Sequence, residues 1–441
     1  MTKKTKQIKF VDIKKKLIKD DDSKSVLKNN KFSYTPHEGA SDMTPSEFKT
    51  FWHFWETITN IANFYGFDRI AFPVIEKPEI YLFGLGKDVD LFKKEMQYIK
   101  TGKDGLVLRP EGTASAIRLV LNTGLLKDKE IVKLFYSGPF FRKEQGIIRE
   151  FNQTGFEIIG VKNAICDVEL INVVHKILTE LNLEEINFEI NSQGCKDCLK
   201  EYTKKLEKYF KSKHAMLCSS CKKHLESKNV LKILQCEKEK CQALLISAPK
   251  IQDSFCTSCK KNYSDLVKYL SDLKIPFKEN PFLFRDIKYY TSNIFNVYLK
   301  DEIIGQGGRY DDLLDLFGAN KRPGSGIAIT SEKILKLLNV SKEEERPPLF
   351  LIQLGDKAKE KSFEILELLR KNNLTTASSL SKSSIKDQMK IAKDLNIQHV
   401  LIIGQEEASR EEIIFHDLPS GLQETIPFKK LITILNKRLK K

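Results

Sequence analysis

The 441-residue chain contains 74 lysine and arginine residues against 59 aspartate and glutamate residues, which gives a formal net charge of +15. Because 41% of the residues are hydrophobic, 30% are charged and no apolar run is long enough to cross a bilayer, the composition excludes a membrane protein. The lysine-rich start lacks the apolar segment of a secretory signal, so we expect a cytoplasmic protein of two or three domains.

The first predicted domain follows a charged tail. Residues 1–30 show little periodicity and are predicted to form a tail outside the fold. Apolar side chains recur at helical spacing in residues 46–66, which predicts a helix. Residues 68–76 are predicted to form a strand, and Pro73 indicates an edge or interface position because proline cannot donate to a β-ladder. We place these elements in a domain whose first part spans residues 31–190.

A β-hairpin is predicted near the middle of this first part. Residues 105–124 first predict a strand, a turn at Pro110–Thr113 and a helix. Two strand patterns, at 134–144 and 147–160, then flank a very short turn. Strands this close in sequence predict an antiparallel hairpin rather than a βαβ unit. A helix of about four turns is predicted to follow at residues 167–181.

One block interrupts the first domain. Residues 191–273 are rich in cysteine and largely helical, and strand patterns resume from residue 280 within the second part of the domain, residues 274–340. The block is therefore predicted to be an insertion. A linker at 341–347 precedes residues 348–441, where strands alternate with helices. This alternation predicts a small α/β domain with helices covering a mainly parallel sheet.

The hairpin carries side chains that are poor material for a core. The two-residue period of its second strand places five residues on one face: Arg149, Phe151, Gln153, Gly155 and Glu157. On the preceding strand Arg142 and Glu144 share a face. Only twelve of the 74 basic residues are arginine, and an arginine fork grips phosphate or carboxylate where lysine offers a point charge. The alternative is a solvated face with cross-strand ion pairs.

Two further polar groups lie outside the hairpin. Glu111 and Thr113 occur at a predicted turn between apolar segments. Arg285, Tyr290 and Tyr310 surround a glycine pair, and glycine lets a ligand approach the backbone closely. The sequence contains neither a P-loop nor a dinucleotide fingerprint. The basic net charge suits a polyanionic partner, although a genome biased toward lysine codons would produce it as well.

Eight of the nine cysteines lie between Cys195 and Cys259. In a chain without an export signal, they are expected to be thiols or metal ligands rather than disulfides. They form three CxxC pairs and a wider fourth pair: Cys195 and Cys198, Cys218 and Cys221, Cys256 and Cys259, and Cys236 and Cys241. This spacing is compatible with two tetrahedral thiolate sites for structural zinc, and the alternative is a set of buried structural thiols.

The motifs LRPEGTA, GPFFRKE, REFNQTGFEIIG, RDIKYY, GGRYDDLL and GSGIAITSEKIL occur in this order. Together they resemble a bacterial histidyl-tRNA synthetase, a class II aminoacyl-tRNA synthetase, over roughly Phe32–Lys437. The resemblance implies an α+β fold, with an antiparallel class II sheet in the catalytic domain, a helical cysteine-rich insertion and a C-terminal α/β anticodon-binding domain. It also implies a homodimer, with the strand around Pro73 near the interface.

The reaction that the resemblance implies uses L-histidine, ATP with Mg²⁺, and histidine tRNA. The carboxylate of histidine would attack the α-phosphate of ATP, and the acyl group of the histidyl-adenylate would then move to the tRNA. Arg142 corresponds to the family's arginine on the α-phosphate and Phe151 to the ring that stacks on adenine. Arg285 corresponds to an arginine between carboxylate and phosphate, so Arg142 and Arg285 are the expected catalytic residues.

Histidine binding is implied for a second set of residues. They are Glu111 and Thr113 around the α-amino group, Gln153 and Arg285 near the carboxylate, and Glu157, Tyr290 and Tyr310 around the imidazole. The chemistry is suitable, because neutral imidazole has one donor and one acceptor nitrogen that a carboxylate and phenol hydroxyls can read.

The sequence departs from the family pattern in three places, one of which is the histidyl signature, where Asp286, Lys288 and Ser292 replace the usual residues. The hairpin loop is short, and Ile147 stands where the family has an arginine near the ATP phosphates. Lys333 replaces the family's ATP-binding arginine, which keeps the charge but loses the fork. The alternative function is therefore a catalytically weak paralogue that senses histidine, as the regulatory subunit of ATP phosphoribosyltransferase does. The C-terminal domain favours the synthetase.

Overall fold

The computed structural model describes residues 34–85, 95–99, 105–285, 287, 289–338, 346–379 and 381–439. The predicted tail and most of the predicted linker lie outside these ranges. The chain divides into two compact units, Met1–Val340 and Ser341–Lys441. Within the described ranges, no helix combines the length and the apolar character needed to cross a membrane.

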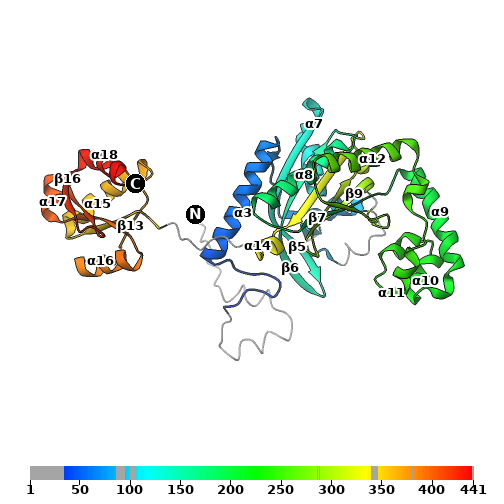
Figure 1. Ribbon diagram of the computed structural model, residues 1–441, viewed down its shortest axis with the longest axis horizontal. Helices are drawn as coiled ribbons and strands as arrows, with labels where there is room; N and C mark the ends of the chain where they lie inside the picture. Colours follow the sequence, from blue (N-terminus) through cyan, green and yellow to red (C-terminus); the bar gives the residue numbers. More distant parts are fainter. Residues whose placement is uncertain are drawn as a thin grey trace, which may run out of the picture. The chain divides into compact units, whose positions relative to one another are not determined.

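The first unit is built on a sheet for which eight strands are described (Figure 1). Their order is β1 (Asp68–Arg69), β5 (Val132–Glu144), β6 (Ile147–Ile159), β11 (Gly324–Thr330), β10 (Glu302–Arg309), β9 (Thr291–Leu299), β7 (Ile186–Ser192) and β8 (Phe277–Glu279). Neighbours from β5 to β7 run antiparallel, whereas β1 and β8 pair in parallel at the two edges. The expected α+β class with an antiparallel sheet is confirmed.

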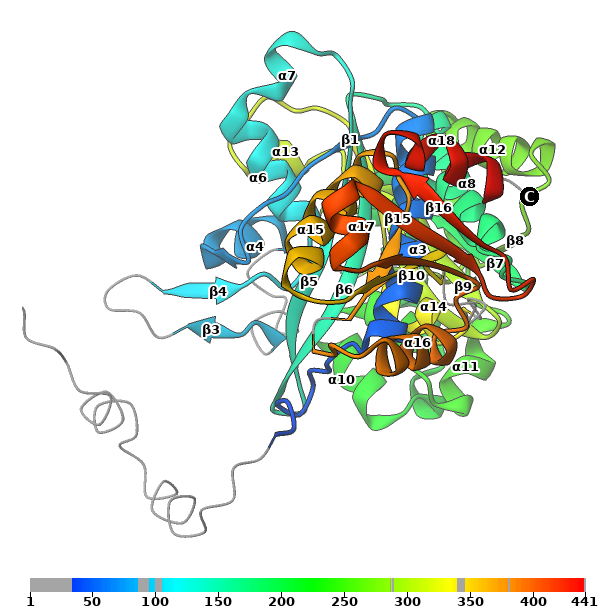
Figure 2. The ribbon, with the colours of Figure 1, turned by 90° about the vertical axis from the view of Figure 1, so that its left-hand side faces the viewer.

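The predicted hairpin consists of β5 and β6, which run side by side in Figure 2. The two strands pair from Val132 opposite Ile159 to Glu144 opposite Ile147. Gln145 and Gly146 form the turn with φ values of 50° and 92°. Positive φ at both turn residues matches the right-handed twist of the flanking strands, which is why so short a loop can join them.

One face of the large sheet packs against α3 (Pro45–Phe64), α8 (Ile165–Glu180) and α12 (Thr257–Asp272). Side chains alternate along β6, so Phe156 and Ile158 enter this core. Residues of the other parity, such as Gln153, face a cavity. The remaining helices of this unit are α4 (Pro78–Leu85), α6 (Thr113–Thr123), α7 (Leu125–Asp128), α13 (Leu313–Leu316) and α14 (Ser331–Leu335).

A small second sheet contains β2 (Ile75–Glu76), β4 (Leu106–Leu108) and β3 (Tyr98–Ile99), and its strands β3 and β4 are visible in Figure 2. The prediction of one strand over residues 68–76 was wrong. The chain pairs with the large sheet at β1 and with the small sheet at β2. Pro73 lies between the two and has no N–H to donate, so a continuous ladder is interrupted there.

The predicted insertion follows β7 and returns at β8. Its helices are α9 (Lys196–Ser212), η1 (His214–Met216), α10 (Ser219–Glu226), η2 (Val230–Gln235), α11 (Glu239–Leu245), η3 (Ile251–Ser254) and α12. Helices α9, α10 and α11 gather at one end of the unit in Figure 1. The strand expected from residue 280 begins only at Thr291, because the loop before it forms hydrogen bonds with side chains of the insertion and of β7 instead of a ladder.

The second unit contains a sheet with strand order β13 (Thr376–Ser378), β12 (Leu349–Gln353), β14 (His399–Ile403), β15 (Glu412–Asp417) and β16 (Gln423–Pro427). Its helices are α15 (Asp356–Lys371), α16 (Ile385–Asp394), α17 (Gln405–Arg410) and α18 (Phe428–Arg438). The α/β prediction is confirmed, but the sheet is not mainly parallel. Strands β13, β12 and β14 are parallel, whereas β15 and β16 are antiparallel additions. The turn between β15 and β16 is too short for a parallel crossover.

Candidate active site

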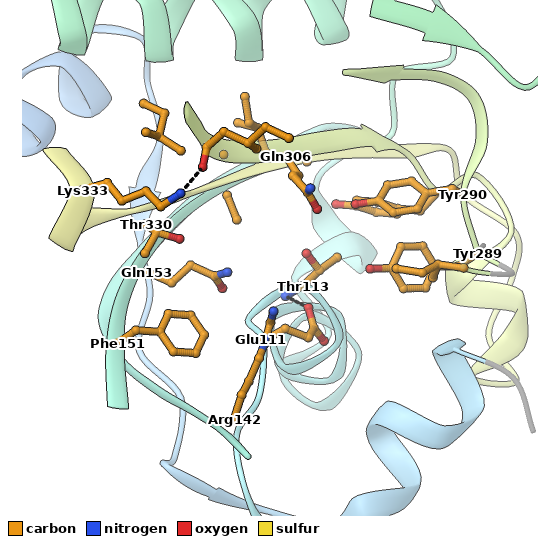
Figure 3. A pocket seen from close by; sticks show the side chains of 18 of the residues that line it. Glu111, Thr113, Arg142, Phe151, Gln153, Tyr289, Tyr290, Gln306, Thr330 and Lys333 are labelled. Carbon is orange, nitrogen blue, oxygen red and sulfur yellow. Dashed lines mark hydrogen bonds between the residues drawn. The ribbon is translucent and has the colours of Figure 1, made fainter. Parts of the chain in front are cut away.

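A cavity of about 300 Å³ lies beside the hairpin, with walls formed by β5, β6, β10, β11 and the start of α6 (Figure 3). The following predicted site residues line it: Glu111, Thr113, Arg142, Phe151, Gln153, Tyr290, Tyr310 and Lys333. In Figure 3, Tyr289 and Tyr290 occupy one end, and Phe151 and Lys333 the other. The cavity therefore brings together residues that are more than 200 positions apart in the chain.

Glu157 lies behind the lining and is only 1% exposed. Its Oε2 accepts a hydrogen bond of 2.5 Å from the hydroxyl of Tyr310, and its Oε1 accepts one of 2.8 Å from Thr113 and one of 3.3 Å from Tyr136. Burial raises the pKa of Glu157 to about 8, against the opposing effect of the Tyr310 and Thr113 hydrogen bonds. Gly326 makes this packing possible, because a Cβ there would lie 1.9 Å from Oε2.

Glu111 occupies the N-terminus of α6. Its carboxylate accepts the backbone N–H of Thr113 at 2.7 Å and that of Ala114 at 3.0 Å, two donors that have no partner within the helix. Burial raises the pKa of Glu111, and these backbone hydrogen bonds oppose the shift. Glu111 thus fixes the turn that carries Thr113, whose hydroxyl in turn contacts Glu157.

Arg142 and Phe151 face each other across the hairpin. The guanidinium of Arg142 lies over the Phe151 ring, with its central carbon 5.2 Å from the ring centroid. Its Nε donates a hydrogen bond of 3.0 Å to the carbonyl of Pro110, which orients the planar group. Nearby, Arg149 and Glu144 form an ion pair of 3.0 Å, the cross-strand pair that was the alternative interpretation of this face. The hairpin therefore contains both a cross-strand ion pair and an arginine that lines the cavity.

Gln153 contributes a polar atom without a partner. Its Oε1 is buried and accepts no hydrogen bond from the described residues. A buried amide oxygen of this kind is costly unless a ligand or water satisfies it, so it favours a polar ligand in the cavity.

The lining also contains residues that the sequence interpretation did not assign to the site, among them Tyr289 and Gln306. The ring centroids of Tyr289 and Tyr290 lie 4.7 Å apart, and both rings face the cavity. The tandem tyrosines and the GQGG motif were visible in the sequence. The sequence could not show which of these residues face a ligand. Their orientation depends on the conformation of a loop, and a loop has no periodic pattern from which side-chain direction can be predicted.

Arg285 does not line the cavity among the described residues. Its guanidinium donates to the side chain of Asn296 and, at 3.4 Å, to the carbonyl of Phe295 on β9. Its Nε is buried without a described partner, and burial lowers its pKa. The backbone N–H of Arg285 donates a hydrogen bond of 2.7 Å to Oε1 of Gln193.

Lys333 lies at the opposite edge of the cavity, on α14. Its ammonium donates to the carbonyl of Ile303 at 3.0 Å and pairs with Glu302 at 3.2 Å. The first of these contacts is drawn in Figure 3. The positive charge of Lys333 therefore remains at the cavity edge, where it is paired with a carboxylate and a carbonyl of β10.

Eight cysteines form two clusters of four. The inner cluster contains Cys195, Cys198, Cys256 and Cys259, and the outer cluster contains Cys218, Cys221, Cys236 and Cys241. Within each cluster all Sγ atoms lie within 4.8 Å of one another. A backbone N–H hydrogen bond from Cys221 lowers the pKa of Cys218 to about 6, and one from Cys259 lowers that of Cys256 to about 7. The chain thus holds two groups of thiols that are compact enough for a metal ion.

The sequence profile described as histidyl-tRNA synthetase matches residues 39–334, and that described as anticodon binding domain matches residues 349–438. The chain is 32% identical to the histidine–tRNA ligase of Thermodesulfovibrio yellowstonii, covering 92% of this chain and 99% of that one. It is 34% identical to the histidine–tRNA ligase of Aquifex aeolicus, covering 89% and 98%. The chain belongs to the histidyl-tRNA synthetase family.

The solved structures agree with this membership. The synthetase matches the apo histidyl-tRNA synthetase of S. aureus with a TM-score of 0.74 and 28% identity, over 91% of this chain and 99% of that one. The match to the anticodon binding domain profile covers the C-terminal unit. The alternative of a histidine-sensing regulatory subunit is therefore not favoured.

Proposed function

We propose that this histidine–tRNA ligase forms histidyl-adenylate in the cavity beside the hairpin and then transfers the histidyl group to histidine tRNA. The observation that carries the proposal is the contrast between two parts of one cavity. Arg142 lies over a phenyl ring at one side, which suits a nucleotide phosphate and its base. Glu157 and Tyr310 form a buried acid–hydroxyl pair at the other, which suits a small polar side chain.

On the histidine side, the imidazole would meet the Tyr290 and Tyr310 hydroxyls, with Glu157 fixing the hydroxyl of Tyr310. The unpartnered Oε1 of Gln153 supports a polar ligand here. Its amide N–H groups could donate to the substrate carboxylate while Oε1 accepts from the ammonium group. Glu111 and Thr113 would lie near that ammonium group, and their fixed positions at the start of α6 support this role.

In the chemical step, a carboxylate oxygen of histidine attacks the α-phosphorus of ATP. The bond to the bridging oxygen breaks, and pyrophosphate leaves with that electron pair. ATP enters as its magnesium complex, so the ion is part of the substrate. Arg142 would stabilise the charge that grows on the phosphate oxygens, and its oriented guanidinium makes it suited to do so. Lys333 would meet the nucleotide from α14.

Arg285 has the role of a bridge between carboxylate and phosphate in this proposal. Its buried Nε without a described partner supports an anionic ligand nearby. A rotation of the side chain away from Asn296 would be required for that contact.

Histidine-dependent exchange of labelled pyrophosphate into ATP tests the proposal, with the other amino acids as controls. Exchange with histidine alone is expected. The second step is tested by charging of histidine tRNA, with another tRNA species as the control. A chain that binds histidine but supports neither exchange nor charging would overturn the proposal in favour of a sensing role.

A cytoplasmic homodimer is also inferred. The side chains of Val74 and Ile75, next to Pro73, are 36% and 49% exposed. Apolar side chains on this edge support an interface near Pro73. Light scattering is expected to give twice the mass of the chain, and Ile75→Asp is expected to shift the protein toward monomer. A parent chain that elutes as a monomer at micromolar concentration would contradict the inference.

We further propose that the inner and outer clusters each bind one structural zinc ion. Tetrahedral Zn²⁺ with Zn–S bonds of about 2.3 Å places sulfurs about 3.8 Å apart, and Sγ of Cys218 and Cys236 lie 3.8 Å apart. An iron–sulfur cluster would hold its sulfurs farther apart than these compact groups. Four thiolates leave no position for a reacting water, so the ions would supply stability rather than chemistry.

A further inference from the structure

The loop between β8 and β9 carries Arg285, and three consecutive residues of this loop are held by side chains. The Nδ2 of Asn191 donates to the carbonyl of Leu283 at 2.8 Å. The Nε2 of Gln235 donates to the carbonyl of Phe284 at 3.1 Å. The Oε1 of Gln193 accepts the N–H of Arg285 at 2.7 Å. These bonds replace the ladder that would otherwise satisfy the backbone groups.

The residues that hold the loop are adjacent to the cysteine clusters. Gln193 precedes Cys195 of the inner cluster by two positions, and Gln235 directly precedes Cys236 of the outer cluster. Gly194, between Gln193 and Cys195, has a φ of 66°. A Cβ there would lie 2.7 Å from the Cβ of Cys198, so the segment packs directly on the inner cluster.

The far end of the loop returns to the same segment. The N–H of Gln193 donates to the carbonyl of Ser292 at 2.7 Å, and the N–H of Ser292 donates to the carbonyl of Gly194 at 3.1 Å. Ser292 has a φ of 52°, a conformation that a residue with a side chain adopts only when its surroundings impose it. The segment therefore fixes both the Arg285 backbone and the point where β9 begins.

The insertion core completes the support. Phe282 and Phe284 pack against the cluster of apolar residues that contains Cys218, Cys221 and Cys241. For a unit of about 80 residues, a hydrophobic core alone supplies little stability, and a structural metal is a common supplement. The free energy of metal binding would then stabilise the folded insertion, which forms the surface on which the loop rests.

We propose that the two metal-bound cysteine clusters position the Arg285 loop for adenylate formation, through Gln193 on the inner side and Gln235 on the outer side. The inference rests on the proposed synthesis of histidyl-adenylate and on the proposed zinc sites. Gln193 and Gln235 are positioning residues, because they hold the backbone on either side of one peptide bond and do not line the cavity. The insertion therefore acts on the first reaction step as well as on any contact with tRNA.

The two glutamines make a discriminating test, because one accepts and the other donates. Gln193→Ala should lower kcat for histidine-dependent pyrophosphate exchange by about 10- to 100-fold, since small displacements of a reacting group have effects of this size. The KM values for ATP and histidine should change far less. Gln193→Glu retains an acceptor for the Arg285 N–H and should restore most of kcat. Gln235→Glu loses its donor and should behave like Gln235→Ala.

The matched control is Gln242→Ala. Gln242 donates to the carbonyl of Cys236 and so contacts the outer cluster without holding the loop. This variant should retain the kcat of the parent. Equal losses in Gln242→Ala and Gln235→Ala, or equal losses in Gln193→Ala and Gln193→Glu, would overturn the proposal.

The metal is tested on the full chain with a chelator and elemental analysis. Two zinc ions per chain are expected, and their removal should lower kcat, with recovery on addition of zinc. Full activity after removal of both ions would overturn the proposal, as would a protein purified without metal that shows normal kcat.

Hydrogen exchange separates this inference from the proposed function. The Arg285 amide should exchange faster in Gln193→Ala and in the metal-depleted protein than in the parent. If the parent protein does not exchange labelled pyrophosphate into ATP, the proposed adenylate synthesis is wrong. The hydrogen-exchange rate of the Arg285 amide still tests whether the clusters position the loop. Unchanged protection of the amide in both samples would overturn the inference by itself.

Discussion

Tyr310 donates a hydrogen bond of 2.5 Å to Oε2 of Glu157, and both side chains are at most 1% exposed. Burial raises the pKa of Glu157 to about 8 from an ordinary value of 4.5. The folded protein therefore binds this proton more tightly than the unfolded chain does. The contribution of the proton to stability is complete below about pH 4.5 and is lost as the pH rises through 8.

Replacement of this acid gives the first prediction. Glu157→Gln cannot ionise, so its free energy of unfolding should rise relative to that of the parent as the pH increases from 5 to 8, on the order of a few kcal/mol. Urea denaturation at pH 5, 6.5 and 8 measures the difference. The exposed Glu360→Gln serves as the control and should show no such trend. A difference for Glu157→Gln that stays constant with pH would contradict the assigned pKa.

The second prediction concerns the Arg142 guanidinium. Arg142→Lys keeps the charge but loses the planar group that lies over Phe151 and donates to the Pro110 carbonyl. We expect histidine-dependent pyrophosphate exchange to fall about 100-fold in kcat, the usual effect of removing one donor to a transition state. Arg149→Lys is the matched control, because Arg149 is paired with Glu144 at the same hairpin. Similar losses in both variants would contradict a specific role for the Arg142 guanidinium, and full activity of Arg142→Lys would show that positive charge alone is sufficient.

Lys333 gives a third prediction, which separates the two substrates. Because its ammonium lies at the Phe151 end of the cavity, Lys333→Ala should raise the KM for ATP several-fold and leave the KM for histidine unchanged. Lys336→Ala, an exposed lysine just beyond the same helix, is the control. Initial rates of pyrophosphate exchange at varied ATP and at varied histidine measure both constants. A change confined to the KM for histidine would contradict this prediction, because it would place Lys333 beside the histidine rather than beside ATP.

The fourth prediction concerns stability next to the site. Arg309 and Asp167 form an ion pair of 3.3 Å with 1% and 0% exposure, and Arg309 also pairs with Asp311 at 2.9 Å. Arg309→Met leaves a buried carboxylate without its partner, so the free energy of unfolding should fall by about 3–5 kcal/mol. The exposed pair of Arg370 and Glu367 provides the contrast, and Arg370→Met should lower the free energy of unfolding far less, because solvent screens this pair. Equal costs in urea denaturation would refute the role of burial.

Much of one wall of the cavity could be predicted from sequence. The two-residue period places Gln153 and Phe151 on one face of β6 in any extended conformation, and the short turn at Gly146 determines their relation to Arg142. The opposite wall depends on which strands pair with β6. Gln306 reaches the cavity only because β11 lies between β6 and β10, and local sequence does not encode that order.

The cysteines show the same limit. Spacing indicates which residues form CxxC pairs, but it does not indicate which pairs meet. Cys195 and Cys198 join Cys256 and Cys259 across the whole insertion, and the outer cluster is nested between them. Similarly, the sequence contained Arg285, but the contact of its backbone with Gln193 depends on where the insertion returns to the sheet.

The parallel pairing of β7 with β8 places a limit on how this chain can be shortened. Phe188 lies opposite Phe277, so the chain leaves β7 at one end of the pair and must travel back before it can enter β8. A tight turn cannot make that connection, because parallel neighbours require a crossover of a dozen or more residues. Helix α12 provides the return path. Removal of the outer helices of the insertion would leave this crossover in place, although the outer cluster would be lost with them, whereas complete excision would detach an edge strand of the catalytic sheet.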